Sequence, residues 1–127
     1  MLHDILSQYL GDIEDSIRRL ESANVERYEE EVLSSSRANL RIRVRFLNGH
    51  LLEVNEAIVI DADQIKHLGY RYHFQDQQNN LIFRYDNTPH FPGLKSFPHH
   101  KHIKNKVEDS DEPLILNVIE EAKLLAQ

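Results

Sequence analysis

Residues 40–46 alternate without exception between a large apolar side chain and an arginine, reading Leu-Arg-Ile-Arg-Val-Arg-Phe. Successive side chains of a β-strand point to opposite faces of a sheet, whereas a helix would scatter this pattern around its axis. The segment is therefore predicted to be a strand with one buried face and one polar face. A sheet of this kind is typically antiparallel and covered on one side.

A hairpin is predicted directly after this strand. Asn48-Gly49 is a strong turn signal. A three-residue loop over residues 48–50 keeps the apolar side chains on one face, and pairs Phe46 with Leu52. The same register pairs Arg45 with Glu53.

A second hairpin is predicted with its turn centred on residues 77–78. That register puts six large side chains on one face: Tyr70, Tyr72, Phe74, Leu81, Phe83 and Tyr85, with Phe74 opposite Leu81, Tyr72 opposite Phe83 and Tyr70 opposite Tyr85. It puts Arg71 beside Arg84 on the other face. His73 and Asp86 are expected close to this pair.

Apolar residues at spacings of three and four predict a helix over about residues 2–21. Ser110-Asp111-Glu112-Pro113 predicts the start of a second helix, and residues 87–100, rich in Pro and Gly, predict a loop. We expect a single α+β domain over residues 1–127. In it, the N-terminal helix precedes an antiparallel sheet of about five strands, largely a meander, and the C-terminal helix packs on the same apolar face. A polar, edge-like strand near residues 25–32 allows a homodimer.

The composition narrows the class of protein. The chain has no cysteine, which excludes disulfides and thiolate metal sites. No apolar run approaches the roughly 20 residues that span a bilayer, so we expect a cytoplasmic protein without a membrane partner. The net charge of −6 argues against nucleic-acid binding over the whole surface. Residues 66–106, however, carry seven basic and two acidic side chains, so a local basic patch is expected.

Arginines are expected to form one cationic sheet face: Arg41, Arg43, Arg45, Arg71 and Arg84. Guanidinium groups bind phosphate through paired hydrogen bonds, and several together anchor a nucleic-acid backbone. The alternative for the first three is a solvated strand face with Arg45 paired to Glu53. Arg71 and Arg84 favour an anion, because like charges opposed across strands destabilise a sheet.

Histidines concentrate in residues 69–103, which hold five of the eight in the chain. Three interpretations stay open. The histidines can act as general acid and base in RNA cleavage through the 2′-hydroxyl, with Arg or Lys stabilising the phosphate. His99 and His102, with His90 or Asp86, can ligate zinc or manganese. Alternatively, they are polar loop residues that help to pack Phe91 and Phe97.

Residues Gly69–Ile103 resemble the TumE family, toxin components of bacterial toxin–antitoxin modules. The resemblance rests on YRYHFQDQQNNLIFRYDNTPH followed by FPHHKHI, and extends more loosely to residues 110–113 and the terminal helix. It implies an intracellular protein that a helix-turn-helix, DNA-binding antitoxin from the same operon holds inactive. This chain has Phe91 and Gly93 where family members often have a histidine and an acidic residue. If that histidine is catalytic, the departure implies weakened activity.

Our first hypothesis is an RNA-cleaving toxin that blocks translation without a cofactor. His73, His99 or His102 would be the acid or base, Arg71 and Arg84 would clamp phosphate, and Lys101 would add charge stabilisation. The pairing of the second hairpin points Tyr72 into the core, which makes it a weaker candidate. One competing hypothesis is a non-catalytic module that binds nucleic acid or a protein through the same face. Another is a metal-dependent nuclease that uses the histidine-rich loop.

Overall fold

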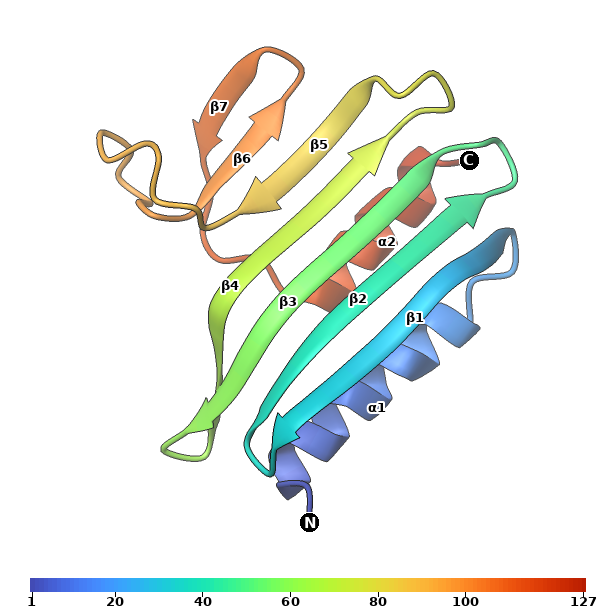
Figure 1. Cartoon of the computed structure of the whole chain (residues 1–127). Coiled ribbons are helices and arrows are strands. Elements are labelled where there is room, and N and C mark those ends of the chain that lie inside the picture. Colours follow the sequence, from blue (N-terminus) through green and yellow to red (C-terminus); the bar gives the residue numbers. More distant parts are fainter.

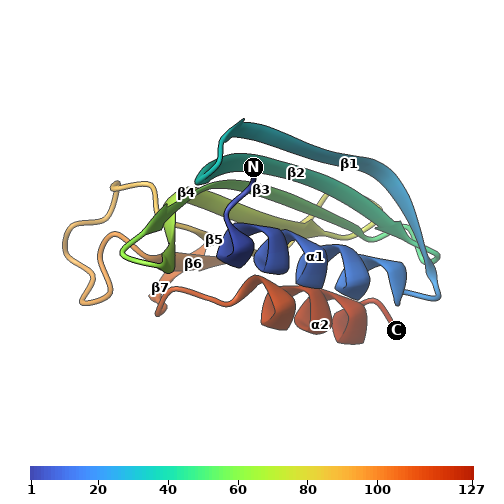
Figure 2. The same cartoon turned by 90° about the horizontal axis from the view of Figure 1, so that it is seen from below.

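The computed structural model describes residues 1–127. It contains a seven-stranded antiparallel sheet in which each strand pairs with the next along the chain, and both helices cover one face (Figures 1 and 2). The elements are α1 (Asp4–Arg18), β1 (Ala23–Ser34), β2 (Arg37–Phe46), β3 (Leu51–Asp61), β4 (Gln64–Gln75), β5 (Leu81–Asp86), β6 (His100–Ile103), β7 (Lys106–Asp109) and α2 (Ile115–Leu125). The predicted α+β class, the meander and the helices on a shared face are confirmed, and the sheet has two more strands than expected.

The hydrophobic core lies between the helices and the sheet. The apolar stripes of α1 and α2 each contribute four buried residues to one cluster, which also contains the inward side chains of β2 to β5. Burying one such side chain stabilises the fold by about 1.5–3 kcal/mol. We call the sheet face under the helices the inner face and the opposite one the outer face. No helix lies on the outer face (Figure 2).

The first hairpin has the predicted faces but a different register. Its three-residue loop is 47–49, so Val44 pairs with Leu52 and Arg43 pairs with Glu53. The predicted pairing of Phe46 with Leu52, and that of Arg45 with Glu53, is wrong by two residues. Gly49 has φ +91° and its N–H bonds the carbonyl of Phe46, so glycine takes the last loop position rather than the middle one.

The second hairpin is also shifted by two residues. Phe74 pairs with Phe83 and Tyr72 pairs with Tyr85, and a bulge follows Phe74. The predicted pairs of Phe74 with Leu81, Tyr72 with Phe83 and Tyr70 with Tyr85 are therefore wrong. The turn closes around the Asp76 carboxylate, which accepts N–H bonds from Gln78 and Asn80. Asn79 adopts the left-handed conformation with φ +67°, which centres the loop later than predicted.

The register change alters which charges face each other across β4 and β5. Arg71 lies opposite Asp86, and His73 lies opposite Arg84, so the predicted placement of Arg71 directly opposite Arg84 is wrong. The alternation still keeps all four side chains on the outer face. Tyr72, predicted to point inward, is fully buried in the core.

The C-terminal part differs most from the predicted pattern. β6 begins at His100, at the end of the predicted loop, and β7 returns antiparallel to it. The second helix does not start at Ser110: α2 begins at Ile115, and the Ser110 hydroxyl bonds the carbonyl of Asp111 instead of capping a helix. Residues 110–114 cross extended from β7 to the helix, which brings Glu112 to the inner face.

Candidate functional site

Strand alternation places six polar residues together on the outer face. β4 contributes Arg71 and His73, β5 contributes Arg84 and Asp86, and β6 contributes His100 and His102. The strands pair so that Asp86 lies opposite His100 and Arg84 lies opposite His102. We call Asp86, His100 and His102 the outer cluster.

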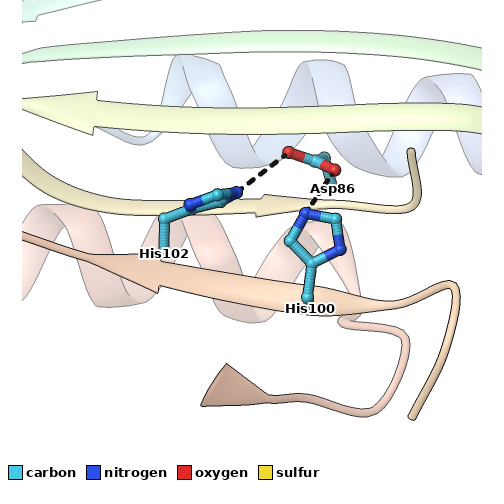
Figure 3. A group of neighbouring side chains, drawn as sticks. All are labelled: Asp86, His100 and His102. Carbon is cyan, nitrogen blue, oxygen red and sulfur yellow. Dashed lines mark ion pairs between the residues drawn. The ribbon is translucent and has the colours of Figure 1, made fainter. Parts of the chain in front are cut away.

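The outer cluster is one carboxylate between two imidazoles (Figure 3). Asp86 Oδ1 lies 2.8 Å from His100 Nε2, and Asp86 Oδ2 lies 3.8 Å from His102 Nε2. The Nδ1 atom of His100 lies 3.0 Å from the carbonyl of Pro98, so this nitrogen carries the proton and donates it. Asp86 also accepts the backbone N–H of Thr88 at 3.0 Å. His100 and Asp86 are therefore held firmly, whereas His102 has one long contact.

The loop between β5 and β6 covers part of this cluster. The Phe91 ring packs edge-on against His100 and His102, with centroids 5.0 and 5.7 Å away. His100 is 1% exposed and Asp86 is 6% exposed, whereas the His102 side chain keeps 24% of its surface open. Burial and the neighbouring charges of His100 and Arg84 lower the pKa of His102. Solvent therefore reaches the cluster through His102.

Arg84 is oriented by His73. The Nε–H of Arg84 donates to His73 Nδ1 at 3.1 Å, and the other ring nitrogen lies 2.8 Å from the Gln75 side-chain oxygen. A guanidinium can only donate, so His73 accepts the Arg84 N–H through Nδ1. The proton of His73 is therefore on Nε2, which donates to Gln75, and the imidazole is neutral. Burial, together with the charges of Arg84 and Arg71, lowers the pKa of His73 and favours this state. The terminal nitrogens of Arg84 stay free.

Two arginines beside the outer cluster have no carboxylate partner. Asp86 is paired with the histidines, and neither Arg71 nor Arg84 forms an ion pair. Burial and the charge of Arg71 lower the pKa of Arg84. The guanidinium groups repel each other, so an anion bound between them would lower the electrostatic energy of this surface.

Two arginines of β2, Arg43 and Arg45, are neutralised on the same face. Glu26 accepts from Arg43 Nε at 2.8 Å and from Arg45 Nε at 3.0 Å, and Glu53 lies 3.4 Å from Arg43. Arg41 forms no ion pair, because Glu29, which lies opposite it in the ladder, is paired with Arg27. Arg43 and Arg45 thus resemble the solvated, paired strand face that was one of the two predicted interpretations, with Arg43 rather than Arg45 next to Glu53.

The remaining predicted site residues lie elsewhere. Lys101 is on the inner face, where it pairs with Glu121 of α2 at 3.2 Å and lies over the Tyr85 ring. His99 Nδ1 is 2.8 Å from the Tyr70 hydroxyl, and the rings stack. His90 is exposed in the loop. The structure thus brings His73, Arg84 and His102 together, and separates them from Lys101 and His99.

A second histidine–carboxylate group lies on the inner face. Glu56 accepts the Tyr9 hydroxyl at 2.9 and 2.8 Å and the Tyr72 hydroxyl, and lies 2.7 Å from His67 Nε2. The other nitrogen of His67 lies 2.7 Å from Glu112. We call these five residues the inner cluster.

Burial and the carboxylate charges of the inner cluster change the pKa values of the other residues in it. Burial and the Glu56 carboxylate raise the pKa of both Tyr9 and Tyr72, so the hydroxyls stay protonated as donors. Burial opposes protonation of His67, but hydrogen bonds to Glu56 and Glu112 outweigh it and raise its pKa. Beside Tyr9 and His67, a cavity of about 460 Å³ extends along the start of α2.

Sequence reasoning missed the inner cluster. One signal was present: Glu56 is an acidic residue at an inward position of β3, between Val54 and Ile58 on the apolar face. A carboxylate at such a position requires partners, because burying an unpaired charge is very costly. The partners themselves come from α1, β4 and the segment before α2, so strand alternation cannot identify them.

One comparison with known proteins identifies the family of the chain. A family model described as toxin TumE matches residues 13–124, so the chain belongs to the TumE toxin family. No curated protein and no solved structure matches the chain. None of the helices is both long and apolar enough to cross a membrane. Membership of a toxin family implies a cognate antitoxin.

Proposed function

We propose that this TumE-family toxin is a ribonuclease that blocks translation, and that RNA binds across the outer face at β4 to β6. The proposal rests on one observation: the arginines of the outer face differ in whether a carboxylate pairs with them. Arg43 and Arg45 are neutralised by Glu26, whereas Arg71 and Arg84 lack acidic partners and lie beside the outer cluster. Free guanidinium groups next to a histidine–carboxylate pair suit a phosphodiester.

In this proposal Arg71 and Arg84 bind the phosphate to be cleaved. His73 is a positioning residue, because both of its nitrogens are engaged and it fixes the Arg84 side chain. The ribose 2′-oxygen bonds to phosphorus as the bond from phosphorus to the 5′-oxygen breaks. His102 takes the proton of the 2′-hydroxyl, since it is the accessible member of the outer cluster, and a solvent water molecule donates a proton to the 5′-oxygen as it leaves.

Lys101 and His99, both predicted as catalytic from the sequence, have other contacts in this account. The Lys101 ammonium faces α2, so it would stabilise the fold rather than the reacting phosphate. His99 is stacked on Tyr70 at the other side of the sheet. We assign neither to the reaction.

The test is cleavage of labelled RNA by the purified chain. His102→Ala and Arg84→Gln are expected to lower the rate by about 100-fold or more. Arg43→Gln, a matched change on the same face, should leave the rate within a factor of about two, because that arginine is already paired. RNA binding without cleavage by the wild-type chain would overturn the ribonuclease and favour a non-catalytic binding module.

The cognate antitoxin implied by the family is proposed to be a helix-turn-helix, DNA-binding protein encoded next to this chain. The proposal follows the family resemblance, since no feature of the fold selects the type of partner. Co-expression of the neighbouring open reading frame should restore growth and co-purify with the chain. An adjacent gene without a DNA-binding fold that still neutralises the toxin would contradict it.

A further inference from the structure

We propose that the outer cluster is a binding site for a divalent transition-metal ion, held by Asp86, His100 and His102. The sequence indicated a metal site built from His99 and His102 with His90 or Asp86. The fold selects a different set, because β6 is a strand and its alternate residues His100 and His102 project to the same face.

The donor set fits ions such as Zn²⁺. Two imidazoles and one carboxylate are the protein ligands of many catalytic zinc sites and of the two-histidine, one-carboxylate iron sites. Three protein ligands leave a position for water or substrate. With no cysteine in the chain, imidazole and carboxylate are the strongest ligands available.

The distances need little adjustment. The three ligand atoms, one from each residue, all lie within 4.8 Å of one another. The shortest contacts of the Asp86 carboxylate are 2.8 Å from Oδ1 to His100 and 3.8 Å from Oδ2 to His102. Metal–ligand bonds of about 2.0–2.2 Å in a tetrahedron put the ligand atoms about 3.3 Å apart. The two histidines face different oxygens of Asp86, so binding one ion requires a small rotation of the carboxylate or of His102. His102, the most exposed of the three, is the one free to move.

The surrounding contacts are those that a metal ligand requires. His100 donates Nδ1–H to the Pro98 carbonyl, so Nε2 is the nitrogen that faces Asp86, and the proton between them is the one that a metal ion would replace (Figure 3). Ligating histidines usually have such a partner on the other nitrogen, because it fixes the tautomer and the ring orientation. The Thr88 N–H holds Asp86 in the same way. Phe91 shields one side of the site.

Arg84, which lies beside the outer cluster, favours an anion as the remaining ligand of the metal ion. Arg84 lies opposite His102 in the ladder, and its charge disfavours a bare cation in the cluster. An anionic ligand that bridges the metal and the guanidinium removes this penalty. A phosphate oxygen has that chemistry, and a metal bound to it would act as a Lewis acid. This last step rests on the proposed ribonuclease, whereas metal binding itself does not. With the ion bound, His102 would be a ligand rather than the base, and a hydroxide on the ion would take the 2′-hydroxyl proton in its place.

The experiment measures metal binding directly, so it is independent of RNA cleavage. The full chain, freed of metal by a chelator and dialysed, is titrated with Zn²⁺ by calorimetry and with Co²⁺ by visible absorption. We expect one ion per chain and a Co²⁺ band typical of nitrogen and oxygen ligands. His102→Gln and Asp86→Asn should each weaken binding by more than about 100-fold.

His90→Gln is the matched control, since it removes an exposed histidine of the same loop. It should leave the affinity unchanged. Because His102 is partly exposed, its substitution is expected to fold, and circular dichroism verifies this for each variant. Absence of one-to-one binding, or equal weakening by His90→Gln and His102→Gln, would overturn the site. Inorganic phosphate should tighten Zn²⁺ binding in the wild type, and no such effect in Arg84→Gln would support the bridging role.

Discussion

Each face of the sheet carries a histidine–carboxylate cluster. The two clusters contain similar residue types but differ in the hydrogen bonds that link them to the rest of the fold. In the inner cluster, Glu56 accepts hydrogen bonds from side chains of α1 and β4, and Glu112 closes the other side of His67. In the outer cluster, Asp86 has one close imidazole and one distant imidazole, and unpaired arginines adjoin it. Residue type alone therefore does not separate a structural cluster from a functional one. In our proposal, the unpaired guanidinium groups beside the outer cluster make the difference.

The inner cluster stabilises the fold in this account, because it joins α1, the sheet and the segment before α2. The outer cluster lies on the face of the sheet without helices, and solvent reaches it through His102. Such a division predicts that changes in the inner cluster alter the free energy of unfolding. Changes in the outer cluster should instead alter ligand binding and turnover.

The largest expected effect on stability comes from Glu56→Ala. The change leaves the hydroxyls of Tyr9 and Tyr72 and the His67 imidazole without their shared acceptor in a buried place. We expect a loss of about 3–5 kcal/mol in the free energy of unfolding, measured by urea denaturation. Glu26→Ala is the control, since Glu26 also has two partners but lies on the surface. Equal losses for both variants would break the contrast between the clusters.

Tyr9→Phe should cost less, about 1–3 kcal/mol, because one hydroxyl donor to a charged acceptor disappears while the ring stays in place. Urea denaturation again gives the value. Tyr28→Phe provides the comparison: its hydroxyl reaches Glu30 at 3.4 Å on an exposed strand and should contribute little. A stability that does not change in Tyr9→Phe would mean that α1 is held by packing alone.

A smaller effect is expected in the salt dependence of RNA binding, which should differ between variants of the unpaired Arg71 and the paired Arg43. Arg71→Gln should reduce the slope of log K against log salt for RNA binding by about 0.7–1, the contribution of one phosphate contact. Arg43→Gln should leave the slope unchanged, because Glu26 and Glu53 neutralise that arginine. Fluorescence anisotropy with labelled RNA at several salt concentrations measures both. Similar slopes for the two variants would place RNA over the whole cationic face.

The smallest effect is a dependence of stability on pH through His67. Its pKa is raised in the folded chain above the ordinary value of 6.5, so the folded state holds a proton that the unfolded state releases. The stabilisation is complete below about 6.5 and is lost as the pH rises through the raised pKa. The melting temperature should fall more steeply over this range in the wild type than in His67→Gln. Parallel curves would show that His67 stays neutral.

Strand alternation predicts much of the fold. The arginine pattern of residues 40–46, the inward ring of Tyr72 and the shared outer face of Arg71 and Arg84 follow from it. Register does not follow, because a shift of two residues keeps every side chain on its face. Both hairpins differ from the prediction by that amount, and the positions of Gly49 and Asn79 in the loops decide the register.

The outer cluster could be predicted from the sequence in part, and the inner cluster could not. The outer cluster draws on residues that lie close in the sequence, so the histidine-rich segment pointed to Asp86 and His102, whereas His100 was not among the candidates. The strand β6 was predicted as loop up to residue 100, which hid the shared orientation of His100 and His102. The inner cluster joins Tyr9, Glu56 and Glu112, which no local pattern connects.

The most direct test compares Asp86→Asn and Glu56→Gln, two isosteric changes that each remove one carboxylate charge. Both proteins are assayed for RNA cleavage under conditions where circular dichroism shows them equally folded. The outer-face account predicts that Asp86→Asn is inactive and that Glu56→Gln cleaves at close to the wild-type rate. Retained cleavage in Asp86→Asn together with lost cleavage in Glu56→Gln would contradict it and move the site to the inner face.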